Sequence, residues 1–389
     1  MKEKNIQIIF ISIFIVIISV IGCLTLLKAE KISYKEGREL VTFATPTYNS
    51  VLDGTYFNNL TNAFADQMAF RERFITMYYL LNLQRYTGDV VKGDGNELFL
   101  SPQIIQNKEE CLENLKNVAK NSINKVAEQV TENGSKFIFL SIPRKDEMME
   151  EYLPKSYIKG TEMYLQSIDG LKESLSENVV LVDAYSVLKE KVDKPFYKTD
   201  HHMNIRGAYT LFEWLISYVN STSNSNIQIS KLEDDYTITN QIVNGAFNRK
   251  IGQSVKAGEE ELTLTYIGKP VTYVRYENGN LSDIPVLGNE NTYASAYMGN
   301  DMAETIIDTS NDDAPNILFV GSSFTNVLEA LSVYKFNKMV SIDYRHNTTG
   351  KSIADYVKEH DIDYTVFICS QSTCALDTYS IRLHLGLVK

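Results

Sequence analysis

The chain reads Ile317-Leu318-Phe319-Val320-Gly321-Ser322-Ser323-Phe324 near its C-terminal end, a short apolar run followed by a glycine and two serines. Four consecutive apolar residues bounded by glycine predict a strand that is buried on both faces, as in parallel sheets. A helix is expected next, at residues 324–333. A serine between a buried strand and a helix lies at the carboxyl edge of the sheet, where open α/β folds bind their ligands.

Strand and helix signals alternate over most of the chain. Compact apolar segments, expected to be strands, lie at 136–142, 179–182, 339–342 and 364–368. Amphipathic segments, expected to be helices, lie at 162–175, 184–191, 205–219 and 352–360. Buried strands between amphipathic helices predict an α/β fold with a mostly parallel sheet and helices on both faces.

Two stretches depart from this alternation. Residues 56–86 carry apolar side chains at spacings near three and four, which predicts helix with an apolar face packed in a core. A Ser/Asn-rich run at 220–226 opens a region rich in Thr, Tyr, Val and Gly, with the hairpin signal Asn278-Gly279. We therefore expect a β-rich insertion at about 220–300 within the α/β domain.

The composition excludes some classes of protein. The 389 residues are 44% hydrophobic, enough for a core, and carry a net charge of -11. Because phosphate backbones need a concentrated basic surface, this acidic chain with scattered Lys and Arg is not expected to bind nucleic acid. The four cysteines, at 23, 111, 369 and 374, show no CxxC spacing. Cys369 and Cys374 could approach each other, but buried free thiols are the expectation.

The N-terminal residues indicate the compartment. Lys2 and Lys4 precede residues 6–27, an uncharged segment long enough to cross a bilayer as one helix. Positive charge before the segment puts the N-terminus in the cytoplasm and the rest of the chain outside. Residues 1–29 are therefore expected to be a membrane anchor or signal segment, and residues 30–389 the extracytoplasmic domain. Lipoprotein anchoring through Cys23 is the alternative.

A second stretch could carry proton chemistry: Tyr197-Lys198-Thr199-Asp200-His201-His202-Met203. The chain has five histidines, and two are adjacent here behind an aspartate. A carboxylate two residues before an imidazole can fix the tautomer of the ring and raise its basicity, as a general base requires. With the serines downstream, the order Asp, His, Ser suggests a hydrolase-type triad assembled from distant segments.

Three other interpretations remain open for these residues. A serine pair after a strand is also typical of a helix cap. Asp200-His201-His202 could form a polar turn before the helix at 205–219, or supply metal ligands. No third or fourth ligand has a recognisable spacing from them, so no metal is expected, and the serine and the Asp-His-His stretch together favour the triad.

Residues 196–204, followed by Gly207-Ala208-Tyr209, resemble the signature of the DHHW family, bacterial membrane-anchored proteins with an Asp-His-His-Trp motif. That family is similar to the SGNH-hydrolase-like domain of the alginate O-acetyltransferases. Those enzymes share an Asp-x-His-Trp motif and a later Gly-Asp-Ser-Phe-like nucleophile motif. Further matching segments, spread over the exported region, are 36–40, 64–68 with Phe70-Arg71, 95–99, 321–326 and 341–345.

The resemblance implies a role for each matching residue. The Asp-x-His pair falls on Asp200 and His202, and the nucleophile falls on Ser323. Ser323 would attack an acyl carbonyl, His202 would take its proton, and Asp200 would orient His202. Two positions depart from the family pattern, because Met203 replaces the tryptophan and Ser322 replaces the aspartate before the nucleophile.

The oxyanion and substrate contacts are less sharply indicated. The backbone N–H of Ser323 is the natural first oxyanion donor, and Gly299-Asn300 could supply the glycine N–H and side-chain amide of SGNH enzymes, or could equally be a turn. Arg144 and Arg345 follow expected strands and could bind an anionic glycan or phosphate. Surface or ion-paired roles are the alternative for both arginines.

The expected activity is therefore the transfer or removal of an ester, acetyl above all, on a cell-envelope polysaccharide by a membrane-anchored SGNH-like enzyme. Such acyl chemistry needs no cofactor. Transfer to a sugar requires an acceptor groove, from the β-rich insertion or the face around Met203, and a membrane partner could deliver the acyl group. The alternative is a non-catalytic envelope protein that keeps the fold to bind glycan or to act as a scaffold.

Overall fold

Two compact units make up the chain in the computed structural model, which describes residues 2–33, 38–82, 89–102, 105, 107–289, 291–299, 303–370 and 378–388. The first unit is residues 1–91 with 246–256, and the second is residues 92–245 with 257–389. The expected boundary between residues 29 and 30 lies within the first unit and stays a prediction. The second unit is not divided at Asn220.

The second unit is built on an eight-stranded sheet with the order β10-β9-β11-β13-β12-β14-β5-β6. The parallel strands are β5 (Lys136–Ile142), β6 (Val179–Asp183), β12 (Ile317–Val320), β13 (Lys338–Ile342) and β14 (Tyr364–Ser370). β12 lies between β13 and β14, so the residues after Val320 emerge in the middle of the carboxyl edge. The expected α/β fold with a mostly parallel sheet is confirmed.

Three antiparallel strands extend one side of this sheet. They are β9 (Val274–Glu277), β10 (Asn280–Ser282) and β11 (Glu304–Asp308). The hairpin expected at Asn278-Gly279 joins β9 to β10, and both residues have positive φ, 48° and 78°, as a type I′ turn requires. β11 was not predicted, because its five residues show neither a continuous apolar run nor a clear alternation.

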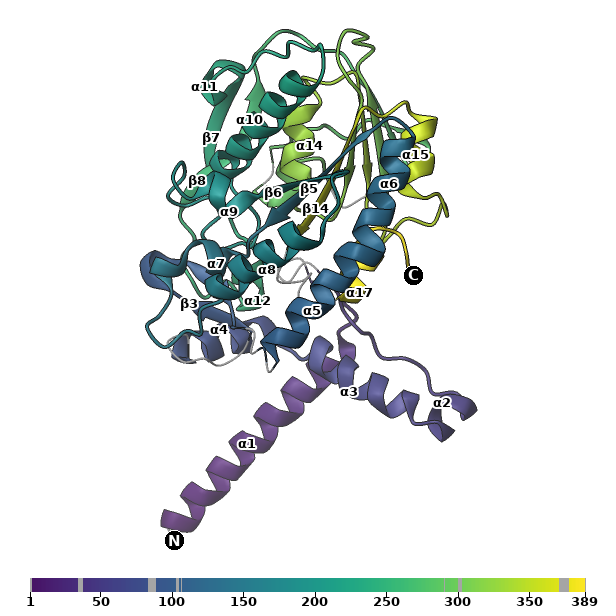
Figure 1. Ribbon diagram of the computed structural model, residues 1–389. Helices are drawn as coiled ribbons and strands as arrows, with labels where there is room; N and C mark the ends of the chain where they lie inside the picture. The colour runs from purple at the N-terminus through teal and green to yellow at the C-terminus, as the bar shows by residue number, and fades with distance from the viewer. Residues whose placement is uncertain are drawn as a thin grey trace. The chain divides into compact units, whose positions relative to one another are not determined.

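Helices cover both faces of the sheet (Figure 1). One layer contains α5 (Lys108–Val118), the π-helical segment η2 (Ala119–Ile123), α6 (Asn124–Glu132), α8 (Thr161–Ser174), α15 (Ile353–Glu359) and α17 (Thr378–His384). The other contains α9 (Ala184–Leu188), α10 (Ile205–Thr222) and α14 (Asn326–Ser332). Phe137, Phe139, Leu318 and Val320 point into the first layer, because alternate strand residues share a face.

Short elements complete the second unit. They are η1 (Asp94–Asn96), β4 (Leu98–Leu100), α7 (Lys145–Met148), η3 (Glu150–Tyr152), α11 (Leu232–Asp235) and α13 (Tyr293–Ala296). β3 (Val90–Lys92) lies at the boundary of the two units. β7 (Tyr236–Ile242) and β8 (Glu259–Tyr266) form a separate antiparallel sheet. The region expected to be β-rich thus contains this sheet as well as β9 and β10, while residues 246–256 belong to the first unit.

The first unit contains α1 (Lys2–Leu27), β1 (Ile32–Ser33), β2 (Arg38–Glu39), α2 (Tyr48–Leu52), α3 (Thr55–Gln67), α4 (Arg71–Asn82) and α12 (Ala246–Lys250). α1 is long and apolar enough to cross a membrane. The helical pattern expected at 56–86 is divided between α3 and α4, with Phe70 at φ 62° in the turn. Its apolar face does not pack in a core, because Phe57, Phe64 and Met77 are exposed.

One cysteine expectation is corrected. Cys369, at the end of β14, is disulfide-bonded rather than a free thiol. Cys374 lies outside the described residues. Cys23 and Cys111 are free. Sequence spacing alone could not decide this point, because only the fold brings two thiols to bonding distance.

Candidate active site

Ser323 sits on the turn that joins β12 to α14. Thr325 N donates a hydrogen bond to Ser322 O at 2.8 Å, which makes the turn tight. A Cβ on Gly321 would lie 2.8 Å from Thr325 Cγ2 and 2.9 Å from a backbone carbonyl of β14, so only glycine fits at this position. The turn therefore presents Ser323 at the carboxyl edge of the sheet.

The Asp-His-His stretch forms the loop that leads into α10. Phe196 and Met203 pair as an isolated β-bridge across its base. Asn204 caps α10 by accepting a hydrogen bond from Gly207 N at 3.0 Å. Met203 is 1% exposed, so its own side chain does not line an open acceptor groove, and the position of such a groove stays a prediction. An apolar side chain at the base of a closed loop is buried by the bridge that closes it.

A close backbone contact holds the middle of this loop. Thr199 Oγ1 donates to Val243 O at 2.8 Å and accepts from Gly245 N at 3.0 Å. A Cβ on Gly245 would lie 2.3 Å from Thr199 O, which requires glycine. The segment after β7 therefore supports the residue that precedes Asp200.

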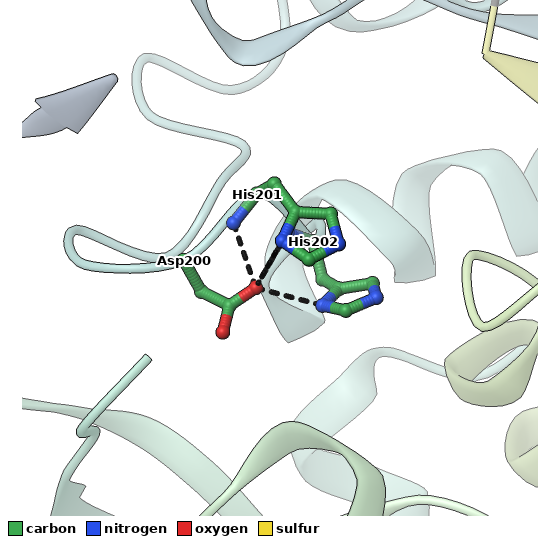
Figure 2. Close-up of side chains that lie close together, drawn as sticks. All are labelled: Asp200, His201 and His202. Carbon is green, nitrogen blue, oxygen red and sulfur yellow. Dashed lines mark hydrogen bonds and ion pairs between the residues drawn. The ribbon is translucent and has the colours of Figure 1, made fainter. Parts of the chain in front are cut away.

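Asp200, His202 and Ser323 form a continuous hydrogen-bonded chain. Asp200 Oδ1 lies 2.7 Å from His202 Nδ1, and His202 Nε2 lies 2.8 Å from Ser323 Oγ (Figure 2 shows the Asp200 end). Because a carboxylate only accepts, Nδ1 carries the proton and Nε2 offers its lone pair to the serine hydroxyl. This arrangement can take a proton from Ser323 and make it a nucleophile. The three residues expected to form a triad thus lie along one chain of hydrogen-bonding contacts, and their catalytic roles stay predictions.

The carboxylate of Asp200 remains ionised although it is buried. Burial alone would raise its pKa, but the charge of His202 and the hydrogen bonds with His201 and His202 hold the pKa well below its usual range. Asp200 Oδ1 also accepts from the backbone N–H groups of His201 at 2.7 Å and His202 at 3.1 Å. The negative charge that orients His202 is therefore present across the neutral pH range.

His201 also lies at the site, although the family resemblance assigns it no role. Its Nδ1 lies 3.1 Å from Asp200 Oδ1, and its ring centroid lies 3.9 Å from that of His202 (Figure 2). The hydrogen bond to Ser323 comes from His202, as expected. His201 is thus a neighbour of both the carboxylate and the base.

Asp200, His201 and His202 could be considered as metal ligands, since their ligand atoms lie within 4.8 Å of one another. Asp200 Oδ1 and His202 Nδ1 are 2.7 Å apart, whereas two ligands of a tetrahedral zinc ion are about 3.3 Å apart. Asp200 Oδ1 also already accepts two backbone hydrogen bonds. The spacing suits a shared proton better than a shared cation.

Sequence reasoning missed an aromatic contact that positions His202. Tyr293, at the start of α13, stacks on the His202 ring with centroids 3.9 Å apart and planes at 3°. Tyr293 OH accepts from Val327 N in the first turn of α14 at 3.3 Å. Phe324 lies 5.2 Å from the same imidazole, centroid to centroid. Tyr293 therefore connects the base to the helix that follows the nucleophile.

Sequence reasoning also missed the buried lysine beneath the loop. Lys145 Nζ donates to Tyr197 O at 2.7 Å and to Lys198 O at 2.6 Å, and it lies 2.9 Å from Glu97 Oε2. Burial lowers the pKa of Lys145, and the charge of Glu97 opposes that shift. Lys194 pairs with the other oxygen of Glu97 at 3.3 Å from a more exposed position. Lys145 thus fixes the backbone just before Asp200.

The predicted substrate-binding arginines are both ion-paired. Arg144 Nε donates to Asp146 Oδ1 at 2.8 Å. Arg345 Nε donates to both carboxylate oxygens of Asp343, at 2.9 and 3.0 Å. Both follow strands of the parallel sheet, so their expected positions are correct and the ion-paired alternative describes their contacts.

The predicted oxyanion pair is described only in part. Gly299 has φ 82°, a turn conformation that favours glycine, and Asn300 lies outside the described residues. Met298, which precedes Gly299, lines a cavity of about 20 Å³ together with Ser323 and Asp343. A cavity of this size holds about one water molecule, so a sugar would have to bind on the open side of Ser323.

A larger cavity of about 540 Å³ lies elsewhere in the second unit. It is lined by residues that precede β12 and β13, such as Asn311 and Tyr334, and by residues that follow α10 and β8. These positions are at the amino edge of the parallel strands, whereas Ser323 follows the carboxyl end of β12. The cavity is therefore not part of the site around Ser323.

Residues 90–344 match the family described as "SGNH hydrolase-like domain, acetyltransferase AlgX". The match covers more than half of the chain and includes Asp200, His202 and Ser323. No curated protein matches the chain.

Two solved proteins have a similar fold. A DHHW family protein from Eubacterium siraeum DSM 15702 has a TM-score of 0.60 and 17% identity, over 77% of this chain and 96% of that one. PatB1 from Bacillus cereus has a TM-score of 0.58 and 19% identity, over 73% and 96%. PatB1 with a sulfonyl adduct also has a TM-score of 0.58, with 18% identity, over 73% and 95%. At these identities the likeness shows the fold.

Proposed function

The chain belongs to the SGNH hydrolase-like domain family of the acetyltransferase AlgX, and from this membership we propose that it is an extracytoplasmic O-acetyltransferase or acetylesterase. Its substrate is an ester on a cell-envelope polysaccharide. Ser323 is the nucleophile, His202 the general base and Asp200 the residue that orients His202.

One observation carries this proposal. His202 Nε2 lies 2.8 Å from Ser323 Oγ while His202 Nδ1 lies 2.7 Å from the buried Asp200 carboxylate. A role in helix capping alone would not explain why an imidazole nitrogen lies 2.8 Å from the hydroxyl of Ser323. A structural histidine would need no serine at the edge of the sheet where ligands bind.

The reaction follows from these contacts in two stages. Ser323 Oγ attacks the acyl carbonyl as its proton passes to His202 Nε2, and the developing imidazolium is stabilised by Asp200. The donor oxygen then leaves with that proton, and the acyl group remains on Ser323. In the second stage a sugar hydroxyl or a water molecule gives its proton to His202 and attacks the acyl-serine. The proton returns to Ser323 Oγ, and the ester or free acid is released.

Donors for the oxyanion are the Ser323 N–H and Gly299 with Asn300, as the family resemblance implies. The ion pairs of Arg144 with Asp146 and of Arg345 with Asp343 favour positioning roles over direct binding of an anionic sugar. A membrane protein that delivers the acyl group to the outer face of the bilayer is the partner that this chemistry calls for.

Membrane anchoring by residues 1–29 is part of the proposal. α1 has the length and composition of a membrane span, and Lys2 and Lys4 favour a cytoplasmic N-terminus. Lipid attachment at Cys23 remains the alternative. The disulfide at Cys369 supports an oxidising compartment outside the cytoplasm for residues 30–389.

A second function is a non-catalytic glycan-binding or scaffold protein with the same fold. Its support is the replacement of the motif aspartate by Ser322 and of the motif tryptophan by Met203. Met203 is buried and Ser322 supports the turn through its backbone carbonyl. The hydrogen bonds of His202 with Asp200 and with Ser323 form in the presence of both departures, which favours the enzyme.

A sulfonyl fluoride probe tests the choice between the two. We expect the full chain in detergent to react at Ser323 alone, because in the part of the chain that the structure describes this is the hydroxyl paired with an imidazole that is itself paired with a buried carboxylate. Peptide mass spectrometry would locate the adduct, and hydrolysis of 4-nitrophenyl acetate by the same sample would measure turnover. Labelling spread over several serines, without turnover, would favour the scaffold.

Tyr293 offers a separate test of how the base is positioned. Tyr293→Leu is expected to lower kcat for the acetyl ester by about tenfold, because aromatic pairs contribute about 0.5–1.5 kcal/mol beyond buried area. Tyr293→Phe keeps the ring and is expected to stay within about twofold of wild type. The measurement is kcat of both variants and wild type on the acetyl ester, together with their melting temperatures. Equal losses in the two variants would show that the hydroxyl, rather than the stacked ring, is what matters.

A further inference from the structure

The first unit exposes an apolar face of a helix, which in most proteins is packed against a core. Phe57, Phe64, Met68 and Phe70 are 56%, 44%, 36% and 49% exposed. They lie on α3 and in the turn that follows it, and we call them the α3 patch. Large apolar side chains gathered in this way mark a binding surface more often than chance exposure.

The patch occupies one face of α3. At 3.6 residues per turn, Phe57, Phe64 and Met68 fall within an arc of about 40°. Asn62 lies on another face, about 140° from Phe57. A third face is buried and contains Asp66 and Gln67. α3 is thus attached to its unit by one side and presents an apolar stripe on a second side.

The attachment places the end of α3 beside the end of α1 (Figure 1). Ala69 N donates to Thr25 Oγ1 at 3.0 Å. Gln67 Oε1 accepts a hydrogen bond from Glu30 N at 3.1 Å, and Gln67 Nε2 donates to Glu30 O at 2.8 Å. Thr25 and Glu30 flank Leu27, the last residue of the apolar helix. The C-terminal end of the patch therefore lies beside the C-terminal end of the apolar helix α1.

We propose that the α3 patch lies in the headgroup region of the bilayer that α1 crosses, so that α3 is an interfacial helix. This inference rests on the proposed anchoring by residues 1–29. Interfacial helices bury an apolar face about 5–10 Å into the boundary between headgroups and acyl chains. The hydrogen bonds of Ala69 with Thr25 and of Gln67 with Glu30 hold the end of α3 beside α1 and so keep the patch near that depth, which gives lipid an advantage over any dissolved partner.

The charge beside the patch suits lipid phosphates. Arg73 is exposed, and its guanidinium lies 5.8 Å from the centroid of the Phe70 ring. A basic side chain next to an aromatic one is typical of the membrane interface, where the ring lies among acyl chains and the charge meets anionic headgroups.

Tryptophan fluorescence in vesicles tests the proposal with the full chain. Trp214, the one tryptophan of the sequence, is replaced by phenylalanine. Phe57→Trp or Phe64→Trp then reports on the patch, and Asn62→Trp on the polar face of the same helix is the matched control. Each protein is reconstituted in phosphatidylcholine and phosphatidylglycerol vesicles, with and without bromine on the upper acyl carbons. Bromine quenches only tryptophans near it.

Tryptophans at positions 57 and 64 are expected to lose roughly half or more of their emission in brominated vesicles, and the one at position 62 little. Equal, weak quenching at the three positions in chains that float with the vesicles would overturn the proposal and leave the anchoring intact. So would emission at positions 57 and 64 that shifts with protein concentration, since a second copy would then cover the patch. Chains that do not float would overturn the anchoring, and the proposal with it, without bearing on turnover at Ser323.

Discussion

Ser323→Ala is expected to lower kcat for an acetyl ester by on the order of 10⁴-fold or more, because it removes the atom that forms the acyl-enzyme. His202→Ala is expected to be nearly as damaging, since Ser323 Oγ has no other base at 2.8 Å among the described residues. Asp200→Ala should be milder, because Asp200 orients the base without taking part in the transfer. The double variant Ser323→Ala/His202→Ala should lose no more than either single variant, since such residues act as a unit.

Stability separates this result from simple unfolding. Ser323 is partly exposed in its turn, and loss of one hydrogen bond costs about 0.5–1.5 kcal/mol. Melting temperatures of Ser323→Ala and wild type should therefore differ by a few degrees at most. Ser322→Ala is the matched control, because Ser322 contributes its backbone carbonyl to the turn and should keep wild-type turnover. Wild-type turnover in Ser323→Ala would leave the scaffold as the better account.

Lys145→Met is expected to destabilise the second unit by about 3–5 kcal/mol, the usual cost of removing one partner of a buried ion pair. The change leaves Glu97 buried with its more distant contact to Lys194. It also removes one of the two donors to each of the carbonyls of Tyr197 and Lys198, which keep only backbone hydrogen bonds from Asp200 N at 3.3 Å and Leu98 N at 2.9 Å among the described residues. The loop that carries Asp200 begins at these carbonyls. Turnover should therefore fall as well, because misplacing a catalytic group by about 1 Å can cost about 10²-fold.

Lys194→Met is the matched control for Lys145→Met. Lys194 pairs with the same carboxylate, but its side chain is 38% exposed, so its loss should cost about 1 kcal/mol or less. Thermal unfolding of both variants, with acetyl-ester kinetics well below the melting temperatures, would measure the difference. Equal destabilisation by the two substitutions would contradict the prediction that burial makes the ion pair of Lys145 more important for stability than that of Lys194.

Several features of the molecule were predicted from the order of residues alone. Residues 136–142 form a strand as predicted, and residues 317–320 do as well, because a continuous apolar run bounded by polar residues is a local property. Alternation of such runs with amphipathic helices was sufficient for the α/β fold. The Asn278-Gly279 hairpin was predicted for a similar reason, since positive φ at both positions is a preference of those residues themselves.

Other features could not be predicted, because they depend on partners far away in the chain. Tyr293 gives no sign in its own surroundings that it will stack on His202, and Lys145 gives none that it will be buried against Glu97. The apolar periodicity of residues 56–68 predicted a buried face, yet periodicity says only which side chains share a face. What that face meets, a core or another surface, is decided by the packing of the whole unit.

The sequence by itself determined the fold class and the identity of Asp200, His202 and Ser323 as the candidate residues. Only the tertiary structure decided that His202 is the imidazole in contact with Ser323, that His201 lies against it, and that Met203 is buried. The reason is physical. Strand and helix preferences arise from the residues of one segment, whereas a hydrogen bond of 2.8 Å between residues 121 positions apart exists only after both segments have packed on the same sheet.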